Sequence, residues 1–238
     1  MPIESDHRAS DSPYIARVWH GRSSGVESLT SVATSNWELV FWEFEGAMHA
    51  AVRGPETSAS TVTAAGDSES FGITFAHGAS MPHLPVPRLV DAELESPYAD
   101  ESVFVLRGEK WAIPGPDCAE DFVRGLVHAG VVTRDPLVDE VVRGGGAEVG
   151  SRSVQRRVAA ATGLTQGAIR QIDRARHAAV LLREGVPSLE VVHRLGYYDQ
   201  PHMARSLRRF VGRTATGLRR DAGEPLSLLY KIEDDERF

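Results

Sequence analysis

The chain of 238 residues is 42% hydrophobic and 25% charged, the balance of an ordinary globular protein with one or two domains. Because it has no apolar run near 18 residues and its N-terminus is polar and acidic, we expect neither a transmembrane helix nor a signal peptide. Its one cysteine, Cys118, excludes an intrachain disulfide and metal–thiolate clusters, and we expect a cytoplasmic protein.

Residues 12–113 have the pattern of short strands separated by glycine and proline. In the clearest strand, Leu39 and Phe41 share one face and Trp42 lies on the other. A hairpin turn is expected at Glu45-Gly46. The expected strands are residues 37–44, 49–52, 61–64 and 71–75. We therefore predict a β-rich N-terminal domain, either a sandwich or a small barrel.

Aromatic residues are concentrated on these candidate strands. Trp37, Trp42 and Phe75 are candidates for lining an apolar pocket that binds a small molecule. The alternative is that the same side chains form an ordinary core, and the sequence leaves both open.

Histidine spacing gives no support for catalysis or for a bound metal. His49, His77 and His83 could gather around a metal together with Glu43, but their spacing matches no close-set ligand motif such as His-Glu-x-x-His. The glycines of residues 144–146 are not followed by the Lys and Ser/Thr of a phosphate-binding loop. We therefore expect no catalytic residues, no metal and no cofactor.

Helical periodicity begins after residue 115. Residues 117–129 have an apolar face that includes Phe122 and Leu126, and they are expected to open an α-helical half. Residues 137–142 can form a short helix. The connection that follows, residues 143–148, contains three glycines, which favour a mobile or irregular loop.

The most informative stretch is residues 188–214, which has the pattern of a helix, a tight turn and a second helix. Gly196 suits a turn position with positive φ, and Asp199 can cap the second helix, whose first turn contains Pro201. The expected apolar stripes are Leu189, Val192 and Leu195 in the first helix and Met203, Leu207 and Phe210 in the second. This is a helix-turn-helix, the unit that places a helix in the DNA major groove.

The same stretch resembles the second helix-turn-helix of AraC/XylS-type transcription regulators, whose pattern runs roughly Gly-Phe-x-Asp-Gln-x-His-Phe-x-Arg-x-Phe-Lys-Arg-x-x-Gly-x-Thr-Pro. The matching residues are Gly196, Asp199, Gln200, His202, Arg205, Arg209, Gly212 and Thr214. Residues 149–165 are similar to the recognition helix of the family's first helix-turn-helix, and residues 167–183 to the long helix that joins the two halves. The chain departs from the pattern at Gly150, Val158 and Ala215, where Ser, Phe and Pro are usual.

This resemblance implies two recognition helices whose Arg and Gln side chains contact base edges, with flanking arginines such as Arg157 and Arg208 on phosphates. The expected DNA contacts are Arg152, Gln155, Arg156, Gln200, His202, Arg205, Arg208 and Arg209. In the family, the N-terminal domain binds a small effector, mediates dimerisation, or does both.

The charge distribution agrees with DNA binding. Residues 148–220 contain 14 arginines and five acidic residues, a net charge of +9. The rest of the chain contains 12 basic and 28 acidic residues, a net charge of −16, so the overall value of −7 hides a basic module attached to an acidic one. Clustered arginine is the electrostatic pattern of phosphate-backbone binding.

We predict an α+β protein with a β-rich effector-binding or dimerisation domain (residues 1–115), an all-α double helix-turn-helix domain (116–225) and an acidic tail (226–238). The predicted function is sequence-specific binding of double-stranded DNA in transcription regulation, under control of a small-molecule effector. The alternative is an effector-independent regulator whose N-terminal domain dimerises or binds a partner protein. A third alternative is an enzyme with a DNA-binding tail, but the N-terminal domain shows no set of residues arranged for catalysis. A homodimer and a contact with RNA polymerase are further candidate partners, and a membrane is not.

Overall fold

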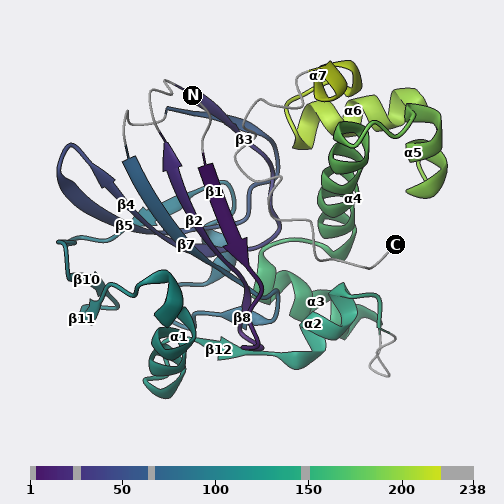
Figure 1. The fold of residues 1–238 in the computed structure, drawn as a ribbon. Coiled ribbons are helices and arrows are strands. Elements are labelled where there is room, and N and C mark those ends of the chain that lie inside the picture. The colour runs from purple at the N-terminus through teal and green to yellow at the C-terminus, as the bar shows by residue number, and fades with distance from the viewer. Residues whose placement is uncertain (1–3, 24–27, 64–67, 146–150, 221–238) are drawn as a thin grey trace.

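The chain divides into a β-rich N-terminal part and an α-helical C-terminal part, which confirms the predicted α+β class (Figure 1). The computed structural model describes residues 4–23, 28–63, 68–145 and 151–220. The two parts lie side by side, and the helices of the C-terminal part extend along one flank of the sheet (Figure 1).

Six strands form one antiparallel sheet in the order β1-β2-β7-β4-β5-β9. They are β1 (Glu4–Arg8), β2 (Ile15–Ser23), β4 (Glu38–Phe44), β5 (Ala47–Arg53), β7 (Ser68–Phe75) and β9 (Glu93–Glu95). The remaining strands pair two by two: β3 (Ser28–Ser31) with β6 (Ser60–Thr63), β8 (Ala79–Ser80) with β12 (Thr133–Arg134), and β10 (Val103–Leu106) with β11 (Glu109–Ala112). The four strands expected from the sequence are present as β4, β5, β6 and β7.

Most of the helices belong to the C-terminal part. The helices are the short 3-10 helices η1 (Val86–Arg88) and η2 (Pro116–Cys118), followed by α1 (Ala119–His128), α2 (Pro136–Val142), α3 (Ser151–Thr162), α4 (Gln166–Arg183), α5 (Ser188–Arg194), α6 (Gln200–Phe210) and α7 (Ala215–Arg220). Figure 1 shows α2 and α3 at one end of α4, with α5, α6 and α7 at the other. A single apolar cluster runs through all of these C-terminal helices.

Two hairpin turns depend on pairs of residues with positive φ. Glu45 and Gly46, at φ 51° and 75°, join β4 to β5 where the sequence predicts a turn. Arg107 and Gly108, at φ 57° and 77°, join β10 to β11 in the same way. Two consecutive positive φ values make a type I′ turn, whose twist matches that of the strands it connects.

The core of the β-rich part lies between the sheet, the β10–β11 hairpin and α1. Leu39 and Phe41 of β4 share an apolar cluster with Phe104 of β10 and with Val123 and Leu126 of α1. The segment expected to be helical is therefore a helix, but its apolar face completes the β-rich core instead of opening the helical half. Where the domain boundary lies stays a prediction.

Candidate nucleic-acid interface

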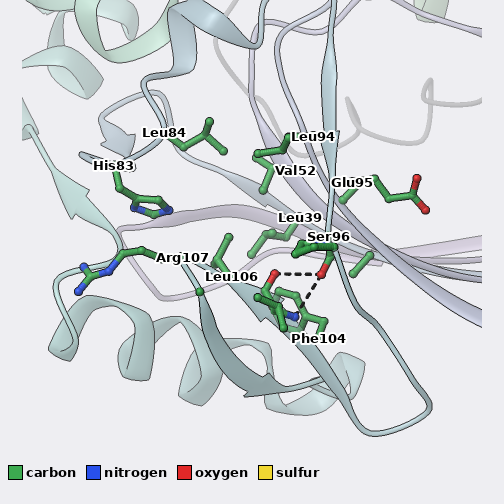
Figure 2. A pocket seen from close by; sticks show the side chains of 15 residues that line it. Leu39, Val52, His83, Leu84, Leu94, Glu95, Ser96, Phe104, Leu106 and Arg107 are labelled. Atoms are coloured by element: carbon green, nitrogen blue, oxygen red, sulfur yellow. Dashed lines mark hydrogen bonds between the residues drawn. The ribbon is translucent and has the colours of Figure 1, made fainter.

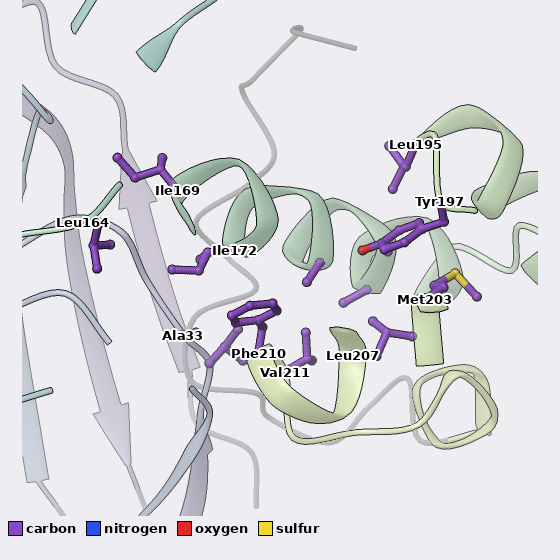
Figure 3. Close-up of a cluster of buried hydrophobic side chains, with 14 of the residues drawn as sticks. Ala33, Leu164, Ile169, Ile172, Leu195, Tyr197, Met203, Leu207, Phe210 and Val211 are labelled. Carbon is purple, nitrogen blue, oxygen red and sulfur yellow. The ribbon is translucent and has the colours of Figure 1, made fainter. Parts of the chain in front are cut away.

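The second helix-turn-helix has the geometry that its sequence predicts. The chain passes from α5 to α6 through Gly196 at φ 63°, a conformation that glycine adopts without strain. The Asp199 carboxylate accepts a hydrogen bond from the backbone N–H of His202 at 2.7 Å and so caps α6. The predicted apolar face is buried against α4 and comprises Met203, Leu207 and Phe210 (Figure 3).

The buried stripe of α5 differs from the prediction at one residue. Leu189 is 58% exposed, whereas Val191 is buried together with Val192 and Leu195. Because α5 begins at Ser188, Leu189 lies in the first turn, and the side that meets α4 and α6 begins two residues later.

The outward side of α6 presents three of the expected DNA contacts. Gln200, Arg205 and Arg208 are exposed, and the two arginines are three residues apart, so they share one helix face. Among the residues that the structure describes, neither arginine forms an ion pair. Their guanidinium groups are therefore available to phosphates or bases.

Two further expected DNA contacts, His202 and Arg209, also make contacts within the protein. The half-buried His202 ring lies edge-on to Tyr197, with centroids 5.3 Å apart, and its Nδ1 accepts a hydrogen bond of 3.4 Å from the N–H of Tyr198. The Arg209 guanidinium lies 4.9 Å from the ring centroid of Phe210. His202 thus braces the turn, and Arg209 lies where α6 ends.

The helices expected to form the first helix-turn-helix are present as α2 and α3, and residues 146–150 of their connection lie outside the described residues. Asp135 caps α2 by accepting the N–H of Leu137 at 3.1 Å. Its two carboxylate oxygens also accept two hydrogen bonds of 2.7 Å from Arg157 of α3. Arg157, expected on a phosphate, is therefore engaged in joining the two helices.

The outward side of α3 presents the other expected DNA contacts. Arg152, Gln155 and Arg156 are exposed, and neither arginine has a carboxylate partner in the described part of the chain. Val154 and Val158 are buried on the opposite side, as predicted, so Val158 fills the position where the family pattern has Phe.

The long helix α4 separates the two recognition helices. Thr165 caps it by accepting the N–H of Ala168 at 3.1 Å. Its predicted apolar stripe is buried in full and comprises Ile169, Ile172, Ala175, Ala179 and Leu182. Eighteen residues at 1.5 Å each make α4 a spacer of about 27 Å.

The β-rich part contacts the C-terminal end of α6 through its backbone. The N–H of Ala33 donates to the Phe210 carbonyl oxygen at 2.8 Å, and the N–H of Ala59 donates to that of Arg209 at 2.8 Å. These are two of the last carbonyls of α6, which have no partner within their own helix. Ala33 is itself fully buried in the helical apolar cluster, beside Phe210 and Val211 (Figure 3).

Arg176 of α4 is the buried charge at this contact. It is 7% exposed, and its Nη1 donates to the Ala33 carbonyl oxygen at 3.0 Å. Burial lowers the pKa of its guanidinium from the ordinary value, while the carboxylates of Asp173, Glu38 and Glu56 oppose that shift. The sequence did not predict this contact. Arg176 directly follows Ala175 of the predicted apolar stripe, and that position could have indicated a buried arginine.

The first recognition helix meets the β-rich part elsewhere, at η1. The turn after α3 contains Gly163, at φ 72°. A Cβ on Gly163 would lie 2.5 Å from the Cγ2 of Val90 and 3.0 Å from the Cα of Pro87. Only glycine permits this approach, which seats α3 against the segment around η1.

The three aromatic candidates for a ligand pocket do not come together. Trp37 and Phe75 stack at 3.8 Å in the core, and Trp37 Nε1 donates to the Ala79 carbonyl oxygen at 2.8 Å. Trp42 lies on the opposite face of β4, stacked on His49 at 5.2 Å. The cavity of about 240 Å³ that the β-rich part does contain lies elsewhere and is lined by none of the three.

The candidate metal histidines are also dispersed. His49 Nδ1 lies 2.8 Å from Glu95 Oε1, and His77 Nε2 lies 2.9 Å from Ser35 Oγ. His83 lines the cavity. Within the described residues, no three His, Cys, Asp or Glu side chains are grouped closely enough to hold a metal ion.

Comparison with protein-family models gives a match to the C-terminal part of the chain. Residues 146–221 match the model of a helix-turn-helix domain of the AraC type. No curated protein and no solved structure matches the chain. A search of the described helices finds none with the length and apolar character needed to cross a membrane.

The matched region begins in the connection before α3 and extends to the end of α7. It therefore contains both recognition helices and the spacer between them, whereas α2 precedes it. The match implies DNA-binding transcription regulation as the function of residues 146–221.

Proposed function

We propose that the protein is a sequence-specific regulator, not an enzyme, that reads double-stranded DNA with α3 and α6. The observation that carries this proposal is the placement of two arginine-bearing helices at opposite ends of α4. The spacer of about 27 Å is comparable to the pitch of DNA, about 34 Å, so the two helices can enter successive major grooves. DNA as partner also assigns the protein to the cytoplasm.

Base contacts are assigned to an exposed Arg and an exposed Gln on each helix. Arg suits the O6 and N7 atoms of guanine and Gln suits adenine. Arg156 and Gln155 would therefore specify one half-site, and Arg205 with Gln200 the other. Arg152 and Arg208 would hold phosphates, which fix the register but not the sequence.

Selection from a random pool of duplexes by the purified full chain tests this function. We expect enrichment of one sequence with two blocks of constrained bases, about one helical turn apart. Enrichment of no sequence, with equal retention of all duplexes, would leave only a non-specific electrostatic binder.

Effector control through the β-rich part is the second element of the proposal. A half-open pocket lined mostly by apolar side chains supports a sensor over a domain that only dimerises. Homodimerisation, binding of a partner protein and a contact with RNA polymerase stay predictions.

A further inference from the structure

The cavity of the β-rich part has an apolar wall and floor. It lies between β4 and β5, the segment before η1, the connection from β9 to β10, and the β10–β11 hairpin (Figure 2). Leu39, Val52, Leu84, Phe104 and Leu106 surround its centre in Figure 2. A cavity of about 150 Å³ is enough for benzene, so about 240 Å³ accommodates a six-membered ring with a small substituent.

One end of the cavity carries positive charge. Figure 2 shows His83 at this end with Arg107 beside it, the Arg107 guanidinium directed away from the centre. The carboxylate of Glu95 also points away from the centre, on the other side, where it pairs with His49. The guanidinium of Arg107 is held only loosely, at 3.5 Å from the Gly130 carbonyl oxygen and 3.9 Å from Glu109. The type I′ turn fixes the backbone from which its side chain leaves.

The charge at this end belongs to Arg107 at neutral pH. Burial, and then the nearby Arg107 guanidinium, lower the pKa of His83 from its ordinary value. Below that lowered pKa a protonated His83 would add a second positive charge, and above it His83 is neutral and can still donate or accept one hydrogen bond.

The segment that lines the cavity also contacts the first recognition helix. His83 and Leu84 face the cavity, and the next residues form η1, where Val86 is fully buried. Pro87 and Val90 then make the close approach to Gly163 at the end of α3. Only two residues of chain therefore separate the cavity wall at Leu84 from Pro87 at the surface of the first helix-turn-helix.

We propose that this cavity binds a compact apolar molecule with one anionic group, which pairs with Arg107, and that its occupancy is passed to α3 through residues 83–90. The exposed Arg107 side chain turns from the distant Glu109 toward the anion, and the apolar body of the ligand displaces water from the centre of the cavity. A bound molecule that changes the position of Leu84 changes the packing of η1 on α3. The proposal rests on DNA reading by α3, because the ligand acts only by its different affinity for two arrangements of that helix.

Calorimetric titration of the full chain with cyclohexanecarboxylate, and with neutral cyclohexylmethanol, tests the site without DNA. We expect the carboxylate to bind about tenfold more tightly than the alcohol, and Arg107→Asn to abolish that difference. Asn tolerates the positive φ of this turn position, so the hairpin is kept. The matched control is Arg124→Gln, at an exposed arginine of α1, which should leave both affinities unchanged.

Either of two results overturns the site. Absence of saturable binding of both probes excludes a ligand cavity of this size, and equal binding of the two probes in the wild-type chain excludes an anionic ligand class. A circular dichroism spectrum and a melting temperature equal to wild type establish that Arg107→Asn is folded.

The link to α3 is tested by measuring affinity for the selected duplex with and without cyclohexanecarboxylate. We expect a change of at least about fivefold, and we expect Val90→Ala to reduce that change while leaving calorimetric binding of the carboxylate intact. Binding of the carboxylate with no change in DNA affinity, or an unaltered response in Val90→Ala, would overturn the route. Because duplex binding is also measured without ligand, failure of this inference is distinct from failure of DNA recognition.

Discussion

The two helix-turn-helix halves contain the same elements, but different contacts position the second helix of each half. Each begins with a seven-residue helix, α2 or α5, followed by a glycine with positive φ, Gly144 at 85° or Gly196 at 63°. The connection between the helices spans five residues in the second half, 195–199, and eight in the first, 143–150. In the second half the short turn itself sets the angle of α6.

The contacts with the β-rich part differ in kind as well. The second recognition helix is bound through two carbonyl oxygens at its C-terminal end. The first is seated by side-chain packing around Gly163 and is tied to α2 by the Asp135–Arg157 pair. Backbone hydrogen bonds fix position strictly, whereas packing against a short segment can shift when that segment moves. We therefore expect α3 to shift more readily than α6 relative to the β-rich part.

The largest effect is expected at the buried arginine beside α6. Arg176→Ala removes the donor to Ala33 and leaves nearby carboxylates without their compensating charge. We expect a loss of about 3–5 kcal/mol in the free energy of unfolding, measured by urea denaturation. Arg170→Ala, at an exposed position of the same helix, is the control and should cost less than about 0.5 kcal/mol. Equal losses in the two variants would show that Arg176 has no special place in this contact.

Base reading by α6 should be separable from phosphate binding. Arg205→Ala is expected to weaken binding to the selected duplex by about 1–3 kcal/mol and to relax its sequence preference. Arg208→Ala should weaken binding to all duplexes similarly and lower the slope of log affinity against log salt by about 1. Fluorescence anisotropy at several salt concentrations measures both. If Arg205→Ala lowers affinity for random and selected duplexes equally, the assignment of roles fails.

The glycines at the two turns provide the most direct comparison of the halves. Gly196→Ala and Gly144→Ala each force a Cβ into the left-handed region, with an expected cost of about 1–2 kcal/mol in unfolding free energy. Neither glycine would bring its Cβ within 4 Å of another group, so backbone strain is the whole effect. If Gly196→Ala lowers the unfolding free energy by this amount and Gly144→Ala does not lower it, then Gly144 does not keep its positive φ in solution.

The smallest effect is expected at the ion pair of the first half. Arg157→Ala removes a half-exposed guanidinium from Asp135, and exposed ion pairs of this kind contribute little to the free energy of unfolding because solvent screens them. If Arg157 serves only to join α2 and α3, the salt slope of DNA binding should remain that of the wild type. A slope lower by about 1 would instead assign Arg157 to a phosphate.

The second half was predictable from the sequence because its determinants are local. Gly196, Asp199 and Pro201 fix a turn and a helix start within six residues, and the stripe at Met203, Leu207 and Phe210 faces α4 as the periodicity requires. The strands β4 and β5 and their Glu45-Gly46 turn were predictable for the same reason.

The long-range contacts were not predictable in the same way. α1 and the C-terminal helices have similar amphipathic patterns, and periodicity does not say which apolar surface each one meets. The backbone bonds from Ala33 and Ala59 to α6 involve no side chain, so sequence pattern carries no trace of them. The density of aromatic residues suggested Trp37 and Phe75 as pocket residues, but these rings stack in the core. The cavity is instead lined by apolar residues of several types, with a few polar ones, from segments far apart in the chain.

The central claim is that one chain reads DNA with both α3 and α6. Methylation-protection footprinting of guanine N7 on the selected duplex tests it most directly, because that atom lies in the major groove. We expect two protected patches about 10 base pairs apart, with Arg156→Ala removing protection from one and Arg205→Ala from the other. A single patch, or one that both variants weaken alike, would contradict the claim that the two helices read separate grooves.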